Sequence, residues 1–596
     1  MDDQKNFVMA IVLSGLVMVG YWYFFGKPLA EEARKNVEFE RAQAEQQIST
    51  PIETPAIVEP QSRETLINSG GRIKIDTPSL SGSFSVTGSI IDDIRLKNYA
   101  ETLDDDSETV IMLTPRGAEK SAYIFDNWTA VDAGSGINTP WTTVGGETLT
   151  PETPVTLQYD GDDFSVRRVV SVDDRYLITF TDTLMNTSGR ELNLTRKGIS
   201  RQHGLRDDLT NFFIIQEGPI AIVDGALEKM KYKKLTKKRE VLAGGEGGWV
   251  GLTDKYWLSA AIAPQGKDIT TKFAYREING QDVYEAAYVT SPMTLTPGAS
   301  VESVSHIFVG AKDRAVLVSY ENDLGIAQFE RAIDWGALRI LVRPMSSVLS
   351  YLGKAVGNFG VAILILTFVI KLLMFPLFNK QYASQAKMKK VQPKQKKLQE
   401  LYKDDRLKLQ QEIMALYKKE GVNPMSGCLP IIPTIFVFFA LYKTVFINID
   451  LRHEPFFGYI RDLSARDPLS ILNGFGAFPW PAIPVEFLSF FAIGPLAILY
   501  GISMSLIYTL TPQGGAGAAG GEQAEMMMKM MKLMPWVFMF ILAPFATGLL
   551  IYWVWNNVLS FIQQYYITRK FNVDTPVDEF FRKITGKAAP KDSNAG

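Results

Sequence analysis

Apolar positions along the chain follow two patterns, and the change from one to the other divides the sequence. Uninterrupted apolar runs occur at residues 7–25 and repeatedly after residue 356, whereas residues 67–309 alternate apolar and polar positions over short stretches. A helix needs about 20 predominantly apolar residues to cross a bilayer, so the long runs predict membrane spans. The short stretches are rich in Val, Ile, Thr and aromatic residues and are broken by Gly, Asn, Asp and Pro, so they predict strands.

The first half of the chain is predicted to be an anchored β domain. A signal-anchor span is expected at residues 1–28, and a helical and proline-rich tether at residues 29–66. A large all-β sandwich is expected over residues 67–335, on stretches such as GSFSVTGSIIDDIRL, FSVRRVVSVDDRYLITFTDTLMN and SVESVSHIFVG. A cleaved signal peptide is the alternative for the first segment, but the chain begins MDDQKN, without the basic start of such a peptide.

The second half predicts a helical membrane unit, led by an amphipathic interfacial helix at residues 336–355. Five spans are expected in it, which with the anchor makes six: residues 356–378, 428–446, 483–510, 528–545 and 547–566. The expected connections are a cytoplasmic helical hairpin at 379–427, an exported loop at 447–482, a glycine-rich cytoplasmic loop at 511–527 and a basic cytoplasmic tail at 567–596. Asp404 and Asp405 are expected to turn the hairpin and to cap its second helix.

Charged residues are segregated along the chain, although the net charge is only −2. Residues 26–337 carry 33 Lys and Arg against 46 Asp and Glu, whereas residues 379–427 carry 12 against 5. Excess Lys and Arg near membrane spans marks the cytoplasmic side. The hairpin and both chain termini are therefore expected in the cytoplasm, and the acidic β domain on the other side of the membrane.

The sequence offers little for covalent chemistry. Cys428 is the single cysteine, and His203, His306 and His453 lie too far apart to give a metal-ligand spacing. The sequence has no glycine-rich phosphate loop with its lysine, no HExxH and no GxSxG. No enzyme activity, catalytic residue, cofactor or metal site is therefore expected.

The polar residue that stands out in the predicted spans is Lys371. An ammonium group in hydrocarbon costs at least about 2.5–3.5 kcal/mol, so Lys371 must face water, a partner or a cavity. Thr367 lies one helical turn earlier on the same face, and Thr434 interrupts the second core span. The alternative is that Lys371 extends to the membrane surface from the last turns before Pro376. A cation in a wetted groove is the favoured interpretation.

A polar stripe on the last span supports such a groove. Tyr552, Asn556, Ser560 and Gln563 occur at positions i, i+4, i+8 and i+11, which places them along one side of a helix. Hydrogen bonding between helices is the ordinary explanation for any one of them. Together with Lys371, the stripe predicts a groove with polar walls and a cationic floor that opens at least to the cytoplasm.

Flexible and aromatic apolar residues border the expected groove. Met530 and Met534 begin the fifth span, and Ile435, Phe436 and Phe439 belong to the third. Thioethers suit a surface that accepts many apolar shapes, so these residues are candidates for a slide along which an incoming apolar helix moves. Simple contact with lipid explains the same residues, and both interpretations stay open.

Several runs of the second half resemble the YidC/Oxa1/Alb3 family of membrane protein insertases. The runs are NFGVAILILTFVIKLLMFPLFNKQYASQAKMKKVQPKQKKLQE, ALYKKEGVNPMSGCLP, FALY, DLSARDP and ATGLLIYWVWNNVLSFIQQ, within residues 346–570. The layout with an anchor and an exported β domain, which includes TPSLSGSFSVTGSIIDDIRLKNYAET, is similar to the type found in Gram-negative bacteria. The resemblance implies a β-supersandwich in the periplasm and five core helices around a hydrophilic groove.

The resemblance also implies which residues line that groove. The essential cation of the family is usually arginine, and Lys371 occupies its position here, so the charge remains but the two-pronged guanidinium is lost. Thr367 matches a threonine of the family, whereas Thr434 replaces a common glutamine. Trp553, beside Tyr552, replaces the second tyrosine of a pair.

The implied function is insertion and chaperoning of newly made proteins in the bacterial inner membrane. The implied partners are nascent membrane proteins, the phospholipid bilayer, the Sec translocon, and ribosomes or targeting factors that dock on the hairpin and tail; no nucleic-acid substrate is expected. A small-solute transporter or channel is the alternative, and a membrane-anchored carbohydrate-active enzyme a second one. A transporter is expected to show an inverted repeat, broken helices or several charges within the membrane, whereas the sequence shows one such charge and no obvious repeat.

Overall fold

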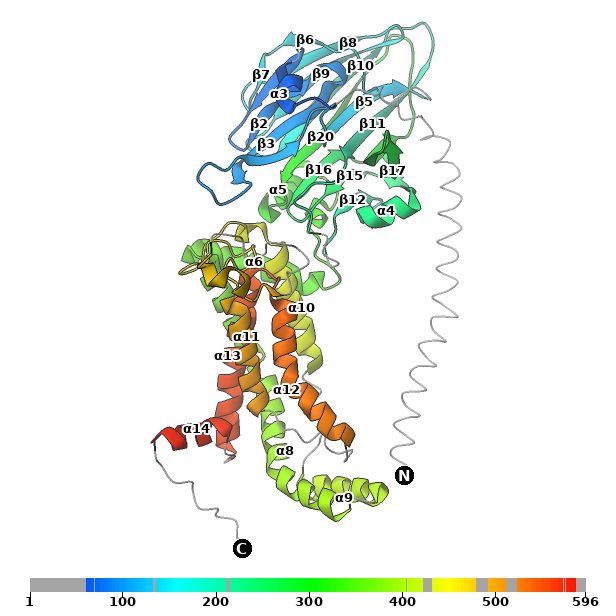
Figure 1. The fold of residues 1–596 in the computed structure, drawn as a ribbon. Helices are drawn as coiled ribbons and strands as arrows, with labels where there is room; N and C mark the ends of the chain where they lie inside the picture. The colour runs from blue at the N-terminus through cyan, green and yellow to red at the C-terminus, as the bar shows by residue number, and fades with distance from the viewer. Residues whose placement is uncertain are drawn as a thin grey trace. The chain divides into compact units, whose positions relative to one another are not determined.

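The computed structural model describes most of the chain after the expected tether (Figure 1). The described residues are 60–68, 70–131, 136–210, 215–402, 405–421, 431–478, 491–510, 522–571, 573 and 575–585. They form two compact units that divide between Asp334 and Trp335. The expected anchor at 1–28 lies outside the described residues, as do most of the tether, residues 511–521 of the glycine-rich loop and residues 586–596 of the tail.

The first unit contains two large sheets (Figure 1). The first sheet has eleven strands: β1 (Arg72–Asp76), β2 (Leu80–Ser85), β3 (Ile90–Ala100), β4 (Thr109–Leu113), β5 (Ala122–Ala130), β7 (Thr148–Leu149), β11 (Leu192–His203), β14 (Glu240–Glu246), β17 (Asp268–Ile278), β18 (Gln281–Thr290) and β19 (Met293–Leu295). The second has nine: β6 (Thr142–Gly145), β8 (Val155–Asp160), β9 (Phe164–Val172), β10 (Leu177–Asn186), β12 (Gly218–Val223), β13 (Ala226–Lys229), β15 (Gly248–Thr253), β16 (Trp257–Ile262) and β20 (Ser300–Ala311).

The two sheets pack face to face as a sandwich. The first runs in the order β14-β17-β18-β11-β5-β3-β2-β1-β7, with β19 on β11 and β4 on β3, and the second in the order β13-β12-β15-β16-β20-β10-β9-β8-β6. Neighbouring strands are antiparallel except β1 and β7. Strands β15 and β16 of the second sheet contact β11 of the first, so the core lies between them. Short helices border the sheets: α3 (Arg63–Asn68), α4 (Tyr232–Lys238) and α5 (Arg314–Leu324), with 3-10 turns at Thr87–Ser89 and Phe329–Ala332.

A fully buried group of charges lies inside this sandwich. Arg168 binds Asp182 through two hydrogen bonds of 2.7 and 2.8 Å, and Arg196 lies 3.0 Å from the same carboxylate. Arg196 also pairs with Asp126, and all four side chains are inaccessible to solvent. Trp128 completes the group, since its indole nitrogen donates to Asp182 at 3.0 Å. Two positive and two negative charges therefore balance within the core, which is the condition under which burial of charge is tolerated.

The second unit consists of helices and two short 3-10 segments. The helices are α6 (Arg339–Val356), α7 (Phe359–Leu373), α8 (Phe375–Leu401), α9 (Arg406–Lys419), α10 (Ile431–Ile447), α11 (Pro495–Leu510), α12 (Glu522–Leu542), α13 (Thr547–Lys570) and α14 (Pro576–Thr585). The 3-10 segments cover Ile449–Leu451 and Ile471–Gly476. Helix α13 is the central element, because it packs on α7, α8, α10 and α11.

The apolar helices in the described part of the chain are short. No single helix there is both long enough and apolar enough to cross a bilayer, whereas α7 and α8 together meet the test as a pair bent by 68°. The break differs from the continuous span expected at 356–378. Pro376 follows it directly, lacks a backbone N–H and restricts the residue before it, so the helix cannot pass straight through this point.

The hairpin forms from α8 and α9, which pack on each other through a small apolar core. Val391 of α8 contacts Leu409, Ile413 and Tyr417 of α9. Asp405 caps α9, since its carboxylate accepts a hydrogen bond from the backbone of Lys408 at 3.0 Å. Helix α8 runs unbroken from Phe375 to Leu401, so one helix connects the end of α7 to the tip of the hairpin.

Candidate functional site

A pocket of about 40 Å³ lies in the second unit where α7, α10 and α13 meet, with the first turn of α8 beside it. Its lining residues are Thr367, Ile370, Lys371, Met374, Phe378, Thr434, Val437, Phe438, Leu441, Tyr552 and Asn556. One water needs about 10–15 Å³ of such space, so the pocket holds about three waters. It also suits a single carboxylate, but it does not hold a folded segment.

Lys371 lies in the last turn of α7 and forms one wall of the pocket. Its ammonium group donates to the Ser560 hydroxyl at 2.6 Å and lies 4.2 Å from the centre of the Phe378 ring. A ring face attracts a cation through its negative quadrupole, so both contacts favour the charged amine. None of the described carboxylates forms an ion pair with Lys371, so within the described residues its charge is compensated by a hydroxyl and a ring rather than by an anion.

The polar stripe of α13 is divided between the pocket and the neighbouring helix. Tyr552 and Asn556 line the pocket, and Ser560 binds Lys371 from one turn further along. Gln563 points to α8 instead, where its amide nitrogen donates to the Asn379 side chain at 3.0 Å. The four stripe residues therefore follow one side of α13, but the stripe leaves the pocket at Ser560.

The two threonines expected in the groove both line the pocket. Thr367 is buried, and its hydroxyl donates to the Ile363 carbonyl at 2.7 Å, so it presents mainly its methyl group and an acceptor oxygen. Thr434, near the start of α10, is partly exposed. Thr367 therefore adds little polarity to the α7 wall, whose polar group is the Lys371 ammonium.

Trp553 lies outside the pocket lining. Its ring packs among Phe438, Tyr442, Tyr500 and Phe545, with ring centres 5.5 to 6.2 Å apart. Successive residues of a helix point about 100° apart, and here Tyr552 faces the pocket while Trp553 faces the aromatic cluster. Trp553 is 4% exposed and stabilises the packing of α13 against α10 and α11.

The residues expected to form an apolar slide are largely exposed. Ile435, Phe436 and Phe439 on α10 are 47%, 49% and 51% exposed, and Met530 on α12 is 59% exposed. Met534 is partly exposed. These exposures suit both contact with lipid and contact with an incoming helix.

Several polar residues near the pocket were not anticipated from the sequence. Asn379 and Gln385 of α8 hydrogen-bond to α13, and Tyr382 stacks on Phe378 at the pocket wall. The spacing of these three residues, at i, i+3 and i+6, is a helical stripe that the sequence displays. The surrounding residues are highly charged, so the sequence pattern favours a solvent-exposed hairpin there.

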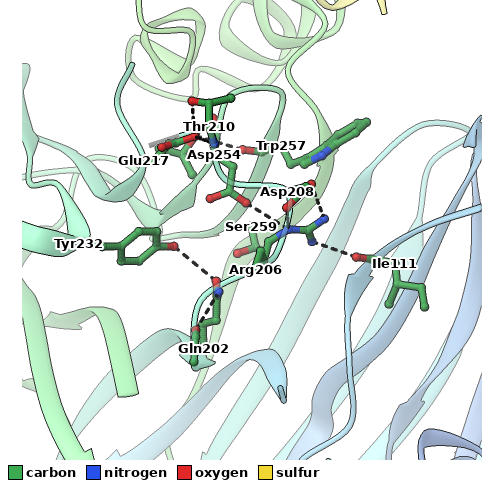
Figure 2. A network of polar contacts seen from close by, with 12 residues as sticks. Ile111, Gln202, Arg206, Asp208, Thr210, Glu217, Tyr232, Asp254, Trp257 and Ser259 are labelled. Carbon is green, nitrogen blue, oxygen red and sulfur yellow. Dashed lines mark hydrogen bonds and ion pairs between the residues drawn. The ribbon is translucent and has the colours of Figure 1, made fainter. Parts of the chain in front are cut away.

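The first unit contains a second polar cluster, centred on Arg206 (Figure 2). Its guanidinium binds Asp208 at 2.9 and 3.0 Å and the Ile111 carbonyl at 2.9 Å, and it lies 3.3 Å from Asp254. Burial and the Asp208 and Glu217 charges raise the pKa of Asp254 to about 7, against the opposing effect of Arg206.

A pocket of about 330 Å³ opens beside this cluster and includes Lys120, His203 and Arg206 in its lining. Burial and the nearby Arg201 charge lower the pKa of His203 to about 4, so this imidazole is neutral at physiological pH. Lys120 pairs with Asp207 at 2.6 Å. The described residues contain no group of three His, Cys, Asp or Glu arranged to hold a metal ion. Lys120 and Arg206, two basic groups of this pocket, are therefore each paired with an aspartate of the same domain.

Comparison with known proteins gives matches along the whole chain. A family model described as 60Kd inner membrane protein matches residues 351–574, and one described as YidC periplasmic domain matches residues 72–348. The curated membrane protein insertase YidC of Maricaulis maris is 42% identical over 594 residues, which cover 98% of each chain. That of Cereibacter sphaeroides is 39% identical over 627 residues, which cover 100% of this chain and 99% of the relative.

A crystal structure of an active YidC insertase aligns with 86% of this chain and 95% of its own, at 15% identity and a TM-score of 0.35. The β-sandwich unit and the helical unit with its partly buried Lys371 define a membrane protein that carries a large β domain. The chain belongs to the YidC family of membrane protein insertases, on the identity and coverage of its relatives. The resemblance stated from the sequence is confirmed, and so is an inner-membrane protein with a periplasmic β-sandwich domain. The family is one of insertases, in agreement with the expectation that the chain is not an enzyme.

Proposed function

We propose that this chain inserts newly made proteins into the inner membrane by receiving their polar flanks at the Lys371 pocket. The observation that carries the proposal is the position of the Lys371 ammonium group at the wall of a pocket enclosed by α7, α10 and α13. A cation held there offers an acidic side chain a partner away from bulk water. Each unsatisfied polar group costs several kcal/mol in hydrocarbon, so such a partner lowers the barrier to crossing.

The volume of the pocket limits how it works. About 40 Å³ admits one carboxylate with water but not a length of polypeptide. The flank therefore passes residue by residue, or the helices around the pocket separate to admit more of it. In both cases Lys371 is the contact for each acidic side chain, and its hydrogen bond to Ser560 keeps the ammonium group at the pocket wall.

The apolar part of a substrate is proposed to move along α10 and α12. Ile435, Phe436, Phe439 and Met530 present exposed apolar surface there, and Met534, one turn after Met530 on α12, is partly exposed. Because the faces are aliphatic, aromatic and thioether in character, they adapt to helices of different shape. The substrate helix leaves along these faces into lipid while its flank is released from the pocket.

The proposed topology has six spans, with both termini in the cytoplasm and the β-sandwich in the periplasm. The basic hairpin and tail face ribosomes or targeting factors, and the Sec translocon associates with the same protein. The charge of the hairpin supports its cytoplasmic placement, since residues 379–427 contain 12 Lys and Arg but only 5 Asp and Glu. Thiol labelling of single cysteines at the chain ends and in the hairpin, from each side of sealed vesicles, tests the topology.

The test of function is reconstitution of the purified protein alone in liposomes. Two small single-span substrates are compared, one with an acidic and one with a neutral translocated flank. Lys371→Arg is expected to retain insertion of both. Lys371→Ala and Lys371→Glu are expected to reduce insertion of the acidic-flank substrate far more than that of the neutral one. Lys354→Ala, which removes an exposed lysine of α6, serves as the charge-matched control.

Two outcomes would contradict the proposal. Full insertion of the acidic-flank substrate by Lys371→Glu would remove the role of charge. Leakage of a trapped small solute without insertion of either substrate would favour a channel, which is the alternative function.

A further inference from the structure

Helix α8, which carries the hairpin, is joined to α13 by two hydrogen bonds between polar side chains. Asn379 accepts from Gln563 at 3.0 Å, and Gln385 accepts from Gln564 at 3.1 Å. Tyr382 lies between Asn379 and Gln385 on α8, and Ser560 lies one turn before Gln563 and Gln564 on α13. We call this set of six side chains the polar seam.

Ser560 connects the polar seam directly to Lys371. Its hydroxyl donates to the Asn556 carbonyl at 2.7 Å and accepts from Lys371 at 2.6 Å. Tyr382 of α8 lies close enough to Ser560 to interact with it. A serine hydroxyl has one proton and two lone pairs, so the proton given to Asn556 turns the lone pairs toward the ammonium group and toward α8. The orientation of the Ser560 oxygen, and with it the position of the ammonium group, is therefore set by the packing of α13 against α7 and α8.

Helix α8 holds Lys371 through a second contact. The Phe378 ring lies 4.2 Å from the ammonium nitrogen and stacks on Tyr382, with ring centres 6.0 Å apart and planes 17° from parallel. Lys371 precedes the bend at Met374, whereas Phe378 and Tyr382 follow it. A change in the bend between α7 and α8 therefore alters both contacts at once.

We propose that the polar seam positions Lys371 at the pocket, with Ser560 and Tyr382 as its positioning residues. The inference rests on the proposed function, because a fixed ammonium group matters only if acidic flanks meet it. A lysine side chain has four rotatable bonds and a strongly hydrated head, so without such contacts it would extend toward water. The seam replaces the rigidity that a planar guanidinium would bring by itself.

The first experiment measures the reactivity of Lys371 toward a water-soluble amine reagent in proteoliposomes, with each lysine read separately by peptide mass spectrometry. Ser560→Ala and Tyr382→Phe are expected to raise the labelling rate of Lys371, Ser560→Ala by about tenfold, the factor that one hydrogen bond to a charged group corresponds to. Ser560→Thr retains a hydroxyl and is expected to restore the original rate. Tyr382→Phe keeps the ring stack on Phe378, so this variant distinguishes the effect of the hydroxyl from the effect of ring packing.

Thr568→Ala is the matched control for the serine variant. Thr568 is a buried hydroxyl of the same helix that donates to the Gln564 carbonyl at 2.8 Å and does not contact Lys371. It is expected to leave the labelling of Lys371 and the insertion of acidic-flank substrates unchanged. Labelling of Lys371 at the original rate in both Ser560→Ala and Tyr382→Phe would overturn the inference.

The second experiment asks whether the seam stays closed during insertion. Cysteines at Gln385 and Gln564, in a Cys428→Ser background, are joined by a short thiol-reactive linker. Since a positioning role needs a closed seam, the linked protein is expected to insert the acidic-flank substrate as fast as the two single-cysteine variants. Loss of insertion on linking, reversed by cleavage of the linker, would show a moving gate and overturn the inference. If Lys371→Ala itself inserts normally, the proposed function fails, while the labelling rates still decide whether the seam positions the amine.

Discussion

Asp254 of the periplasmic domain gives a prediction whose size follows from the structure. It lies between β15 and β16, is 8% exposed, and has one carboxylate oxygen 3.3 Å from Arg206. The other oxygen is buried without a hydrogen-bond partner in the described part of the chain. Loss of hydration is the main reason why the pKa of Asp254 rises from 3.8 to about 7 (Figure 2).

The sign of the effect on stability follows from this shift in pKa. The folded domain binds a proton at Asp254 between pH 4 and 7, where the unfolded chain has released it, so the proton stabilises the fold there. The contribution is complete below pH 4 and is lost as the pH rises through 7. At 1.36 kcal/mol for each unit of pKa, Asp254 alone lowers the free energy of unfolding by about 2.5 kcal/mol between pH 5 and pH 8.

Asp254→Asn is expected to abolish this dependence, because the amide does not titrate. The free energy of unfolding of the β domain is measured by urea titration and pulse proteolysis of the full-length protein in detergent, at pH 5 and pH 8. The difference between the free energies of unfolding at pH 5 and at pH 8 should change by about 2.5 kcal/mol relative to the original protein. Asp207→Asn, whose carboxylate is 88% exposed in the same cluster, is the control and should not change it. An unchanged pH dependence in Asp254→Asn would refute the reasoning.

Three further predictions concern the same domain and the same urea assay. Asp182→Ala leaves two buried guanidinium groups without their shared partner and should cost about 3–5 kcal/mol; loss of less than 1 kcal/mol would contradict it. Gly310→Ala places a methyl group 2.3 Å from the Tyr176 ring and should cost about 1–3 kcal/mol, whereas Gly189→Ala meets no atom within 4 Å and should be neutral. His203→Gln should raise stability at pH 5 by about 2 kcal/mol and not at pH 8, because a pKa lowered from 6.5 to about 4 makes the imidazole resist protonation when folded; equal effects at both pH values would exclude this cause.

Local patterns in the sequence were sufficient for much of the fold. Alternating strands such as β10 were predictable because one face of each strand is buried, so apolar residues tend to recur at every second position. Asp405 was predictable as a helix cap, since a carboxylate before a charged amphipathic run satisfies the first backbone N–H groups. The turn between the last two helices lies at residues 543–546, where small residues and proline interrupt an apolar run.

Features that depend on tertiary contacts were not visible in the same way. Lys371 was identifiable because a charge in an apolar run has few explanations, but its partners Ser560 and Phe378 come from other helices. Trp553 was assigned to the groove by analogy with a tyrosine, and its larger apolar ring instead fills an aromatic cluster. The Asp254 cluster had no sequence signal, since its members are separated by loops of irregular length.

The balanced charges in the sandwich core set the order in which the exported domain can be completed. Asp126, Arg168, Asp182 and Arg196 come from four strands, and each is inaccessible to solvent only when the others are present. A nascent chain exported only as far as β10 holds two carboxylates against one guanidinium and cannot dehydrate them. The domain therefore stays open at least until Arg196 emerges. Because β11 pairs with β18 and β10 pairs with β20, protease resistance of stalled export intermediates should rise sharply only once the chain has passed β20.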